Sequence, residues 1–370
     1  MEYLFIVDTL AQHGAERYLF EIVKSLKSRG HEIKVLSFFK LNNQHDFYVN
    51  KLIENHINVK TFEFKIFKNK FLNRITLSLL RRLRLGMFNK LFNEKLVTFL
   101  KNHNNIFIIK WDVYLKYNDV FQKLEKINIC IMSGLIQYSQ NPYLNLPINK
   151  TVFYIFYKEQ ENEILGGRIF SNITFKFVPL LIDNEKSINR YCPSNREFRI
   201  GIFSRINTDQ PTLFALFILH LLKTKAENYS LYFFGRVYDQ NYFDLMKQTI
   251  NYLKINNSVF FYDHTIDLPG AIENYNLNIG LMNCNLKTKG YSSIELESAG
   301  LPIIYFDINE NIKIDDKENL IFSDLIDIVN TISDISTDTN YQKKLSEHTF
   351  NKSKDDFGIS RNINFIKEFE

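Results

Sequence analysis

Tyr3-Leu-Phe-Ile-Val7 is a continuous apolar run that is too short for a helix, and it opens the segment whose pattern decides the fold. From Gly14 onward apolar residues recur at helical spacing, basic residues fill the last turn, and Gly30 ends the helix. The run His31-Glu-Ile-Lys-Val-Leu-Ser-Phe38 then predicts a second strand. A crossover helix between two strands makes them parallel neighbours, so the chain begins with a β-α-β unit.

The same alternation returns in the second half of the chain. Strands are predicted at Phe198–Phe203, Ser230–Phe234, Val259–Tyr262, Leu277–Leu281 and Pro302–Phe306, and helices near Pro211–Leu222, Tyr242–Leu253, Pro269–Asn274 and Ser293–Ser298. Between the two series, strand-like runs lie at Ile106–Ile109, Ile129–Ile131 and Val152–Phe156. The expected fold class is therefore α/β, with two parallel-sheet layers in series.

The domain boundaries are predicted where the alternation of apolar strands and helices is interrupted. Residues 184–196 are polar and contain Pro193, which predicts a linker. We then expect a first domain over 1–183, a second over 197–345, and a C-terminal helix within 346–370 that could cross back to the first domain. A chain of 370 residues is long enough for two domains that each bury a core.

The composition indicates the cellular compartment and excludes some classes of protein. The three cysteines, Cys130, Cys192 and Cys284, are an odd number without a Cys-x-x-Cys spacing, which argues against a disulfide framework and a thiolate zinc site. The apolar runs fall short of the roughly 20 residues that a membrane-spanning helix needs, and Glu2 and Asp8 disfavour a signal peptide. We expect a cytoplasmic protein that does not span a membrane.

The net charge is only +5, but one stretch is strongly basic. Between Lys65 and Lys101 ten basic residues and a single acid, Glu94, are interleaved with leucine and phenylalanine. This pattern suits the anionic inner face of a membrane, where each Lys or Arg gains about 1 kcal/mol from the surface potential. Nucleic acid is the weaker alternative because no nucleic-acid motif accompanies the charge. An ordinary solvated face over core-packed helices explains the stretch equally well.

Candidate chemistry lies beyond the carboxyl ends of the predicted strands, where parallel sheets bind ligands. The run Lys287-Thr-Lys-Gly-Tyr-Ser-Ser-Ile-Glu-Leu-Glu-Ser-Ala-Gly-Leu-Pro302 places glycine and serine directly before a short helix, which favours an anion site. The residues that could hold an anion there are Gly290, Ser292, Ser293, Lys287 and Lys289. Glu295 could turn a carboxylate toward a ribose diol. The serines could equally cap the helix, and the charged residues could be solvated surface groups.

This run resembles the nucleotide-sugar loop of the group 1 glycosyltransferases, the family-4-type retaining class with a GT-B fold, whose usual form is E-G-F-G-x-x-x-x-E-A-x-x-x-G-x-P. His13-Gly-Ala-Glu-Arg17 is similar to that family's G-G-A-E-R helix, and Ile202-Phe-Ser-Arg205 resembles the G-R that opens its C-terminal domain. The resemblance covers the first forty residues and roughly 178–306. It implies two Rossmann-like domains with a cleft between them, the acceptor on the first and the nucleotide-sugar on the second.

Site roles follow from the resemblance position by position. Glu295 is expected to bind the ribose hydroxyls of the nucleotide, and Arg205 to contact its diphosphate. Gly290 would let the backbone approach the donor, and Gly14 would lie in the N-terminal loop at the cleft.

The chain also departs from the family pattern. Lys287 stands where the family has a glutamate that touches the donor sugar, and Gln210 or Pro211 stands where it has a phosphate-binding lysine. We therefore expect Arg205 and Lys287 to act as the catalytic cations, with Lys289 as the other lysine that could supply the missing charge.

No metal is expected at this site. The sequence holds no two aspartates two residues apart, so the Asp-x-Asp device that binds a metal-diphosphate is absent, and arginine and lysine would neutralise the leaving group instead. His-Glu-x-x-His, P-loop, Gly-x-Ser-x-Gly and Gly-x-Gly-x-x-Gly motifs are missing from the sequence too.

The sequence thus predicts a metal-independent glycosyltransferase of hexosyltransferase type without a cofactor. It would move a sugar from a nucleotide-sugar to a saccharide or lipid-linked saccharide in surface polysaccharide synthesis, with retention implied by the resemblance alone. Two alternatives stay open, a nucleotide-sugar epimerase on the same fold and a catalytically silent GT-B subunit that binds a partner enzyme.

Overall fold

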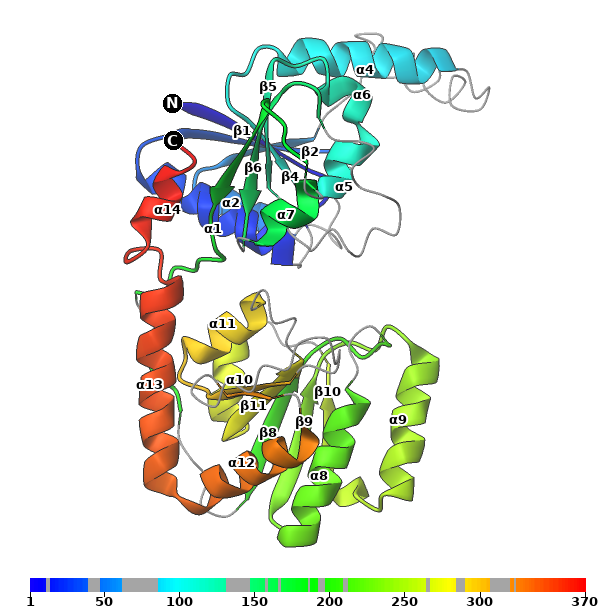
Figure 1. Ribbon diagram of the computed structural model, residues 1–370, viewed down its shortest axis with the longest axis vertical. Helices are drawn as coiled ribbons and strands as arrows, with labels where there is room; N and C mark the ends of the chain where they lie inside the picture. The colour runs from blue at the N-terminus through cyan, green and yellow to red at the C-terminus, as the bar shows by residue number, and fades with distance from the viewer. Residues whose placement is uncertain are drawn as a thin grey trace. The chain divides into compact units, whose positions relative to one another are not determined.

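The computed structural model describes residues 1–10, 14–38, 47–61, 86–130, 147–156, 159–165, 168–185, 187–191, 197–208, 212–263, 267–283, 290–306, 320–322 and 324–370. These residues form two compact units, each built on its own sheet (Figure 1). The first unit combines Met1–Leu181 with Ile363–Glu370, and the second is Ile182–Asn362. Two parallel-sheet α/β units in series confirm the fold class that the sequence predicts.

The first unit contains, within the described residues, seven parallel strands in the order β3-β2-β1-β4-β5-β6-β7. The strands are β1 Glu2–Val7, β2 Glu32–Ser37, β3 Asn58–Thr61, β4 Ile106–Ile109, β5 Lys126–Cys130, β6 Lys150–Ile155 and β7 Ile173–Phe177. The helices are α1 Gly14–Ser28, α2 Phe47–Glu54, α4 Gly86–Leu100, α5 Trp111–Lys116, α6 Asn118–Phe121, α7 Glu159–Leu165 and α14 Ile363–Lys367. The strand order reverses at β1, which pairs with β2 on one side and with β4 on the other.

Alternation along β1 explains how this sheet acquires two apolar faces, since successive side chains of a strand point to opposite sides. Leu4 and Ile6 join an apolar cluster with residues of α4, α5 and α6. Phe5 lies on the other face and stacks on Phe107, with ring centroids 4.9 Å apart. Both faces are covered, which is why the strand reads as an uninterrupted apolar run.

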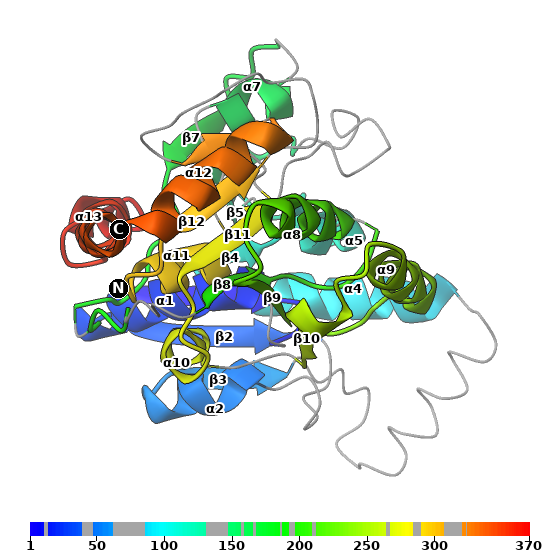
Figure 2. The ribbon, with the colours of Figure 1, turned by 90° about the horizontal axis from the view of Figure 1, so that it is seen from below.

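The second unit contains, among its described residues, six parallel strands in the order β10-β9-β8-β11-β12-β13, and β8 to β12 can be followed side by side in Figure 2. The strands are β8 Phe198–Phe203, β9 Tyr229–Phe234, β10 Val259–Tyr262, β11 Ile279–Asn283, β12 Ile303–Phe306 and β13 Ile321–Phe322. The helices are α8 Leu213–Lys225, α9 Gln240–Tyr252, α10 Leu268–Asn274, α11 Tyr291–Glu297, α12 Leu325–Thr337 and α13 Thr339–Phe357. Here the strand order reverses at β8, between β9 and β11.

Two apolar clusters cover the two faces of this second sheet. Side chains from α8, α9 and α12 pack with Ile200, Ile202 and Leu231 on one face. Side chains from α10 and α11 pack with Phe203 and Tyr232 on the other. The sheet is therefore buried on both sides, and its strand ends are the places left for ligands.

The C-terminal segment 346–370 holds two helices rather than one. Helix α13 ends at Phe357 within the second unit, and the short α14 follows in the first unit. Phe369 stacks on Tyr154 with ring centroids 4.5 Å apart, and the Tyr154 hydroxyl donates to the Glu368 carbonyl at 3.1 Å. The last residues are thus anchored on the sheet of the first unit.

The described part of 184–196 packs on the second unit. The buried Asn184 amide donates to the Ser353 carbonyl at 3.3 Å. Asn189 lies against Gly300, where an added Cβ would meet its Oδ1 at 2.1 Å. Gly300 also has a φ of +87°, so both its space and its backbone favour glycine.

Candidate functional site

The reversal point of the second sheet places Arg205 at its carboxyl edge. Strand β8 ends at Phe203, and Arg205 follows two residues later with an exposed side chain. Its guanidinium carbon lies 5.8 Å from the centroid of the Tyr238 ring. Among the described residues Arg205 has no ion-pair partner, so its charge is available to an anion at the point where parallel sheets bind ligands.

The loops that follow β8 and β9 hold each other in place. The Ile206 N–H donates to the Arg236 carbonyl at 3.0 Å, and the Tyr238 N–H donates to the Ile206 carbonyl at 3.0 Å. Gly235 permits this approach, because a Cβ there would lie 1.9 Å from the Ser204 carbonyl oxygen. The backbone around Arg205 is therefore fixed by a neighbouring strand end rather than left as a free loop.

Arg236 is a second cation at this edge, and the sequence analysis assigned it no role. It forms an ion pair with Asp263 at 3.7 Å, but both side chains are mostly exposed, so the pair contributes little stability. The only sequence signal for Arg236 is its place directly after a strand and a glycine. Because Asp263 offsets the charge of Arg236, Arg205 is the described cation that leaves a positive charge at this edge of the second sheet.

Helix α11 carries the predicted donor loop residues. Gly290 is exposed at its N-cap, and an added Cβ would meet nothing within 4 Å, so the fold itself does not require glycine there. Ser292 is half-buried, whereas Ser293 is buried and donates to the Gly290 carbonyl at 2.8 Å. The Ser293 hydroxyl thus serves the first turn of the helix, while Gly290 and Ser292 stay open to a ligand.

The two glutamates of α11 differ in their surroundings. Glu297 is buried and accepts a hydrogen bond from the Tyr305 hydroxyl at 2.9 Å. Glu295 is half-buried on the same helix. Glu297 therefore has a packing role, and Glu295 is the carboxylate of the pair that a ligand could reach.

Several predicted positions lie outside the described residues. These are Lys287, Lys289, Gln210 and Pro211. Gly14 is described at the start of α1 in the first unit, exposed, with open space around it. The structure therefore places Arg205 and Gly290 to Glu295 on the second unit and Gly14 on the first.

The first sheet carries a charged cluster at its own reversal point, which the sequence analysis did not identify. The Lys110 ammonium donates to Glu16 Oε1 at 2.8 Å and to Asp8 Oδ1 at 3.2 Å. Thr9 Oγ1 donates to the same oxygen of Glu16 at 2.9 Å. Burial alone would lower the pKa of Lys110, but the Glu16 charge and then the Asp8 charge outweigh it, and the pKa lies above its usual value.

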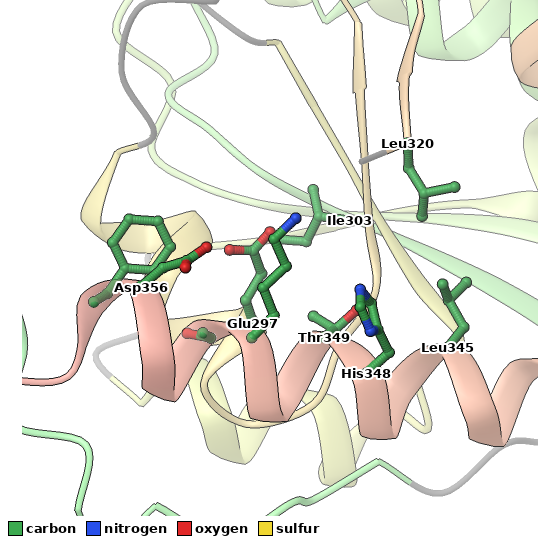
Figure 3. Close-up of a pocket in the computed structure, with 10 residues that line it drawn as sticks. Glu297, Ile303, Leu320, Leu345, His348, Thr349 and Asp356 are labelled. Atoms are coloured by element: carbon green, nitrogen blue, oxygen red, sulfur yellow. The ribbon is translucent and has the colours of Figure 1, made fainter. Parts of the chain in front are cut away.

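A hollow lies beside α11 and α13, lined by Glu297, Ile303, His348 and Asp356 among others (Figure 3). Its cavity volume is about 30 Å³. Sites for ligands of drug size or larger measure about 300–1,000 Å³, so this hollow has room for about one water and is not the donor site.

The described residues contain no group of three or more His, Cys, Asp or Glu side chains placed to hold a metal ion. Cys130 is free and buried, and burial raises the pKa of its thiol. Of the helices described, none has the length and hydropathy needed to cross a membrane.

The basic stretch 65–101 is described only from α4 onward. Lys90, Lys95 and Lys101 are exposed there. Leu96 and Leu100 on the same helix are buried in the core of the first unit. This end of the stretch is thus a charged face over a core-packed helix, and Arg81, Arg82 and Arg84 lie outside the described residues.

No protein-family model matches the sequence, and no curated protein sequence matches it either. Solved structures match over the full length of the chain. The Anabaena HepE protein in complex with UDP-glucose superimposes with a TM-score of 0.70 at 15% identity, covering 100% of this chain and 98% of that one. A glycosyltransferase from Rickettsia africae gives a TM-score of 0.65 at 17% identity, covering 100% and 98%.

The lipopolysaccharide outer core galactosyltransferase WaaB gives a TM-score of 0.67 at 13% identity, covering 100% of this chain and 99% of that one. The likeness extends through both units and their order along the chain. The chain therefore has the two-domain fold of the GT-B glycosyltransferases.

Proposed function

We propose that the chain is a glycosyltransferase that moves a sugar from a nucleotide-sugar to a saccharide or lipid-linked saccharide acceptor. The observation that carries the proposal is the full-length likeness to solved structures, one of which holds UDP-glucose. The exposed cation Arg205 at the carboxyl edge of the second sheet supports it independently, because a fold alone does not fix a function.

The donor site would lie on the second unit. When the bond between sugar and diphosphate breaks, negative charge grows on the diphosphate, and a preorganised cation stabilises that charge more than it stabilises the bound donor. Arg205 and Lys287 are the proposed cations, Lys289 is the other lysine that could supply the second charge, and Arg236 is a further candidate. Glu295 would accept hydrogen bonds from the ribose.

Gly290 and Ser292 complete the proposed donor contacts on the second unit, and Gly14 on the first unit is proposed from the family resemblance alone. The open space around Gly290 favours close approach of a ligand to the backbone. Ser293 would act by holding that turn in shape.

Transfer would not need a metal ion, because the sequence lacks an Asp-x-Asp pair and cations flank the proposed site. Retention of the anomeric configuration is proposed from the family resemblance alone. The acceptor would bind the first unit, and the basic stretch 65–101 would hold the protein at an anionic membrane surface on the cytoplasmic side.

The test is turnover by the full chain of a panel of UDP-, GDP- and ADP-sugars, with nucleotide release measured with and without alkyl glycoside acceptors, in buffer and in excess EDTA. We expect release that depends on an acceptor and persists in EDTA. Isomerised donor without acceptor would indicate the epimerase, and no binding of any nucleotide-sugar would indicate the silent subunit. A strict requirement for Mn²⁺ or Mg²⁺ would exclude the metal-independent mechanism.

A further inference from the structure

The charged cluster of the first unit lies where general topology predicts a ligand. Strands β1 and β4 are parallel neighbours on which the strand order reverses, and Asp8 and Lys110 are the first residues after them. A crevice beyond the carboxyl ends of two such strands is the usual ligand position in open α/β sheets. The cluster thus occupies the same topological place in the first sheet that Arg205 occupies in the second.

The backbone of Lys110 is strained. Its φ is +79° and its ψ is 139°, far from the left-handed helical values near +57° and +47°, and such a backbone is rare in residues that carry a Cβ. The Lys110 N–H donates to the Cys130 carbonyl at 3.1 Å, which fixes this geometry. Strain of this kind raises the free energy of the folded state, and it concentrates where a side chain must be held in one position.

The buried carboxylate of Glu16 also lowers the stability of the folded state. Its side chain is 1% exposed, and the hydrogen bonds from Thr9 and Lys110 both go to Oε1. Oε2 is buried and has no hydrogen-bond partner among the described residues. Because apolar side chains of similar volume often stabilise a fold as well as a buried ion pair does, stability alone does not account for this arrangement.

The cluster leaves one hydrogen-bond acceptor on Asp8 and one hydrogen-bond donor on Lys110 available to a ligand. Asp8 Oδ1 accepts from Lys110 Nζ and from the Thr9 N–H at 2.8 Å, while Asp8 Oδ2 has no partner among the described residues. An ammonium has three protons, and Lys110 uses two of them on Asp8 and Glu16. The Asp8 and Lys110 side chains are 29% and 21% exposed, so a small ligand can reach both.

Charge decides which ligand fits. Asp8, Glu16 and Lys110 carry two negative charges and one positive charge, so the cluster has a net negative charge that disfavours phosphate or carboxylate. A neutral vicinal diol suits it, because one hydroxyl can donate to Asp8 Oδ2 while the neighbouring oxygen accepts from Lys110.

Aromatic rings adjoin the cluster. Phe38 follows β2 at the same sheet edge, and its ring centroid lies 4.4 Å from that of Tyr117; both side chains are half-buried. Burial and then the Asp8 charge raise the pKa of Tyr117, so the phenol lies within electrostatic reach of Asp8. Apolar surface beside a few placed polar groups is the usual composition of a small-molecule site.

We propose that Asp8 and Lys110 form a binding site for a neutral saccharide diol, with Glu16 and Thr9 as positioning residues that hold the ammonium and with Phe38 and Tyr117 alongside the ring. That this saccharide is the acceptor of transfer rests on the proposed function. The binding itself does not, because it can be measured without turnover.

The experiment titrates the full chain with methyl α-glucopyranoside, methyl α-galactopyranoside and methyl α-mannopyranoside, with glucose 1-phosphate as the charged comparison, by ligand-observed NMR. We expect at least one neutral glycoside to bind more tightly than glucose 1-phosphate. Asp8→Ala and Lys110→Met should each weaken its affinity tenfold or more, while the affinity for UDP stays within twofold of wild type.

Lys34→Met is the matched control. Lys34 lies on the same sheet and forms ion pairs with Glu2 at 3.0 Å and Glu32 at 3.5 Å, so its loss removes a similar surface charge pair at a different place. It should leave glycoside affinity unchanged. If Lys110→Met does not fold because Glu16 is left unpaired, the double variant Lys110→Met/Glu16→Gln removes both charges and replaces it in the test.

Three results would overturn the proposal. They are no binding of any neutral glycoside to the wild-type chain, tighter binding of glucose 1-phosphate that Lys110→Met abolishes, and wild-type glycoside affinity in Asp8→Ala and Lys110→Met. Failure of the wild-type chain to bind any nucleotide is a different result, because it contradicts the proposed function and leaves the glycoside titration to decide the site.

Discussion

The two sheets reverse their strand order in the same way, yet the side chains at the two reversal points differ in kind. After β1 and β4, Lys110 is tied to Asp8 and Glu16 in a partly buried network. After β8, Arg205 is exposed and has no ion-pair partner in the described part of the chain. A paired network offers hydrogen bonds to neutral hydroxyls, whereas an unpaired cation attracts an anion.

This contrast teaches that one topology can supply two different chemistries, because the strand ends fix the place and the loop residues fix the charge. Under our proposals the first reversal point would take the saccharide and the second the diphosphate.

Arg205→Ala tests the anion side of the contrast. We expect kcat/KM for sugar transfer to fall by roughly 10²–10³, because the arginine stabilises charge that grows on the leaving diphosphate. Arg190→Ala is the control, since Arg190 is a surface arginine of the same unit paired with Glu273 at 3.2 Å. Equal activity in the two variants would remove Arg205 from the site.

Glu295→Ala tests which carboxylate of α11 reaches the nucleotide. We expect nucleotide affinity to weaken by about 1.5–3 kcal/mol, the range for hydrogen bonds to a charged group. Glu297→Gln should instead leave nucleotide affinity unchanged and lower the free energy of unfolding, because Glu297 is buried against the Tyr305 hydroxyl. Isothermal titration and thermal melting separate the two effects, and the reverse pattern would exchange the roles of the two residues.

Gly290→Ala and Gly235→Ala separate ligand approach from folding. A Cβ at Gly290 meets nothing within 4 Å, so we expect unchanged thermal stability and weaker nucleotide binding. A Cβ at Gly235 would meet the Ser204 carbonyl oxygen at 1.9 Å, so we expect a loss of about 1–3 kcal/mol in stability from overpacking. Unchanged nucleotide affinity in Gly290→Ala would show that no ligand approaches the backbone there.

Glu370→Gln addresses the opposite edge of the first sheet and should leave both reversal points intact. Hydrogen bonds from Arg29 and then His31 lower the pKa of Glu370 to about 2. A lowered carboxyl pKa stabilises the fold above its usual value near 4.3, and this stabilisation is lost as the pH falls through about 2. The pair is partly exposed, so we expect only about 0.2–1 kcal/mol at pH 7.

Trp111 is the only tryptophan of the chain and lies in the first unit, so its fluorescence reports the unfolding of that unit. The difference between Glu370→Gln and wild type should shrink as the pH is lowered from 5 toward 2. Glu273→Gln, in an exposed pair of the second unit, should show no change in this signal. A difference that grows at low pH would contradict the assigned partners.

The bounds of strands with continuous apolar runs could be predicted closely. Both faces of a parallel sheet are buried, so an uninterrupted apolar run marks such a strand in the sequence. Strands β8 and β10 agree with the predicted bounds, and β1 and β9 begin one residue earlier than predicted. Strand β7, with only intermediate and exposed side chains, lacks that signal and was missed. The edge strand β3 was missed for the same reason.

The sequence by itself determined the alternation of strands and helices that opens each unit and the presence of a glycine-serine loop before α11, because local periodicity and turn chemistry depend on neighbouring residues. Only the tertiary structure decided that Lys110 meets Asp8 and Glu16, which lie 102 and 94 positions away in the chain. It also decided that Gly235, at the end of β9, packs closely against the backbone of Ser204 beside Arg205. The physical reason is that strand pairing brings distant carboxyl ends to one edge, and no local pattern records which ends will meet.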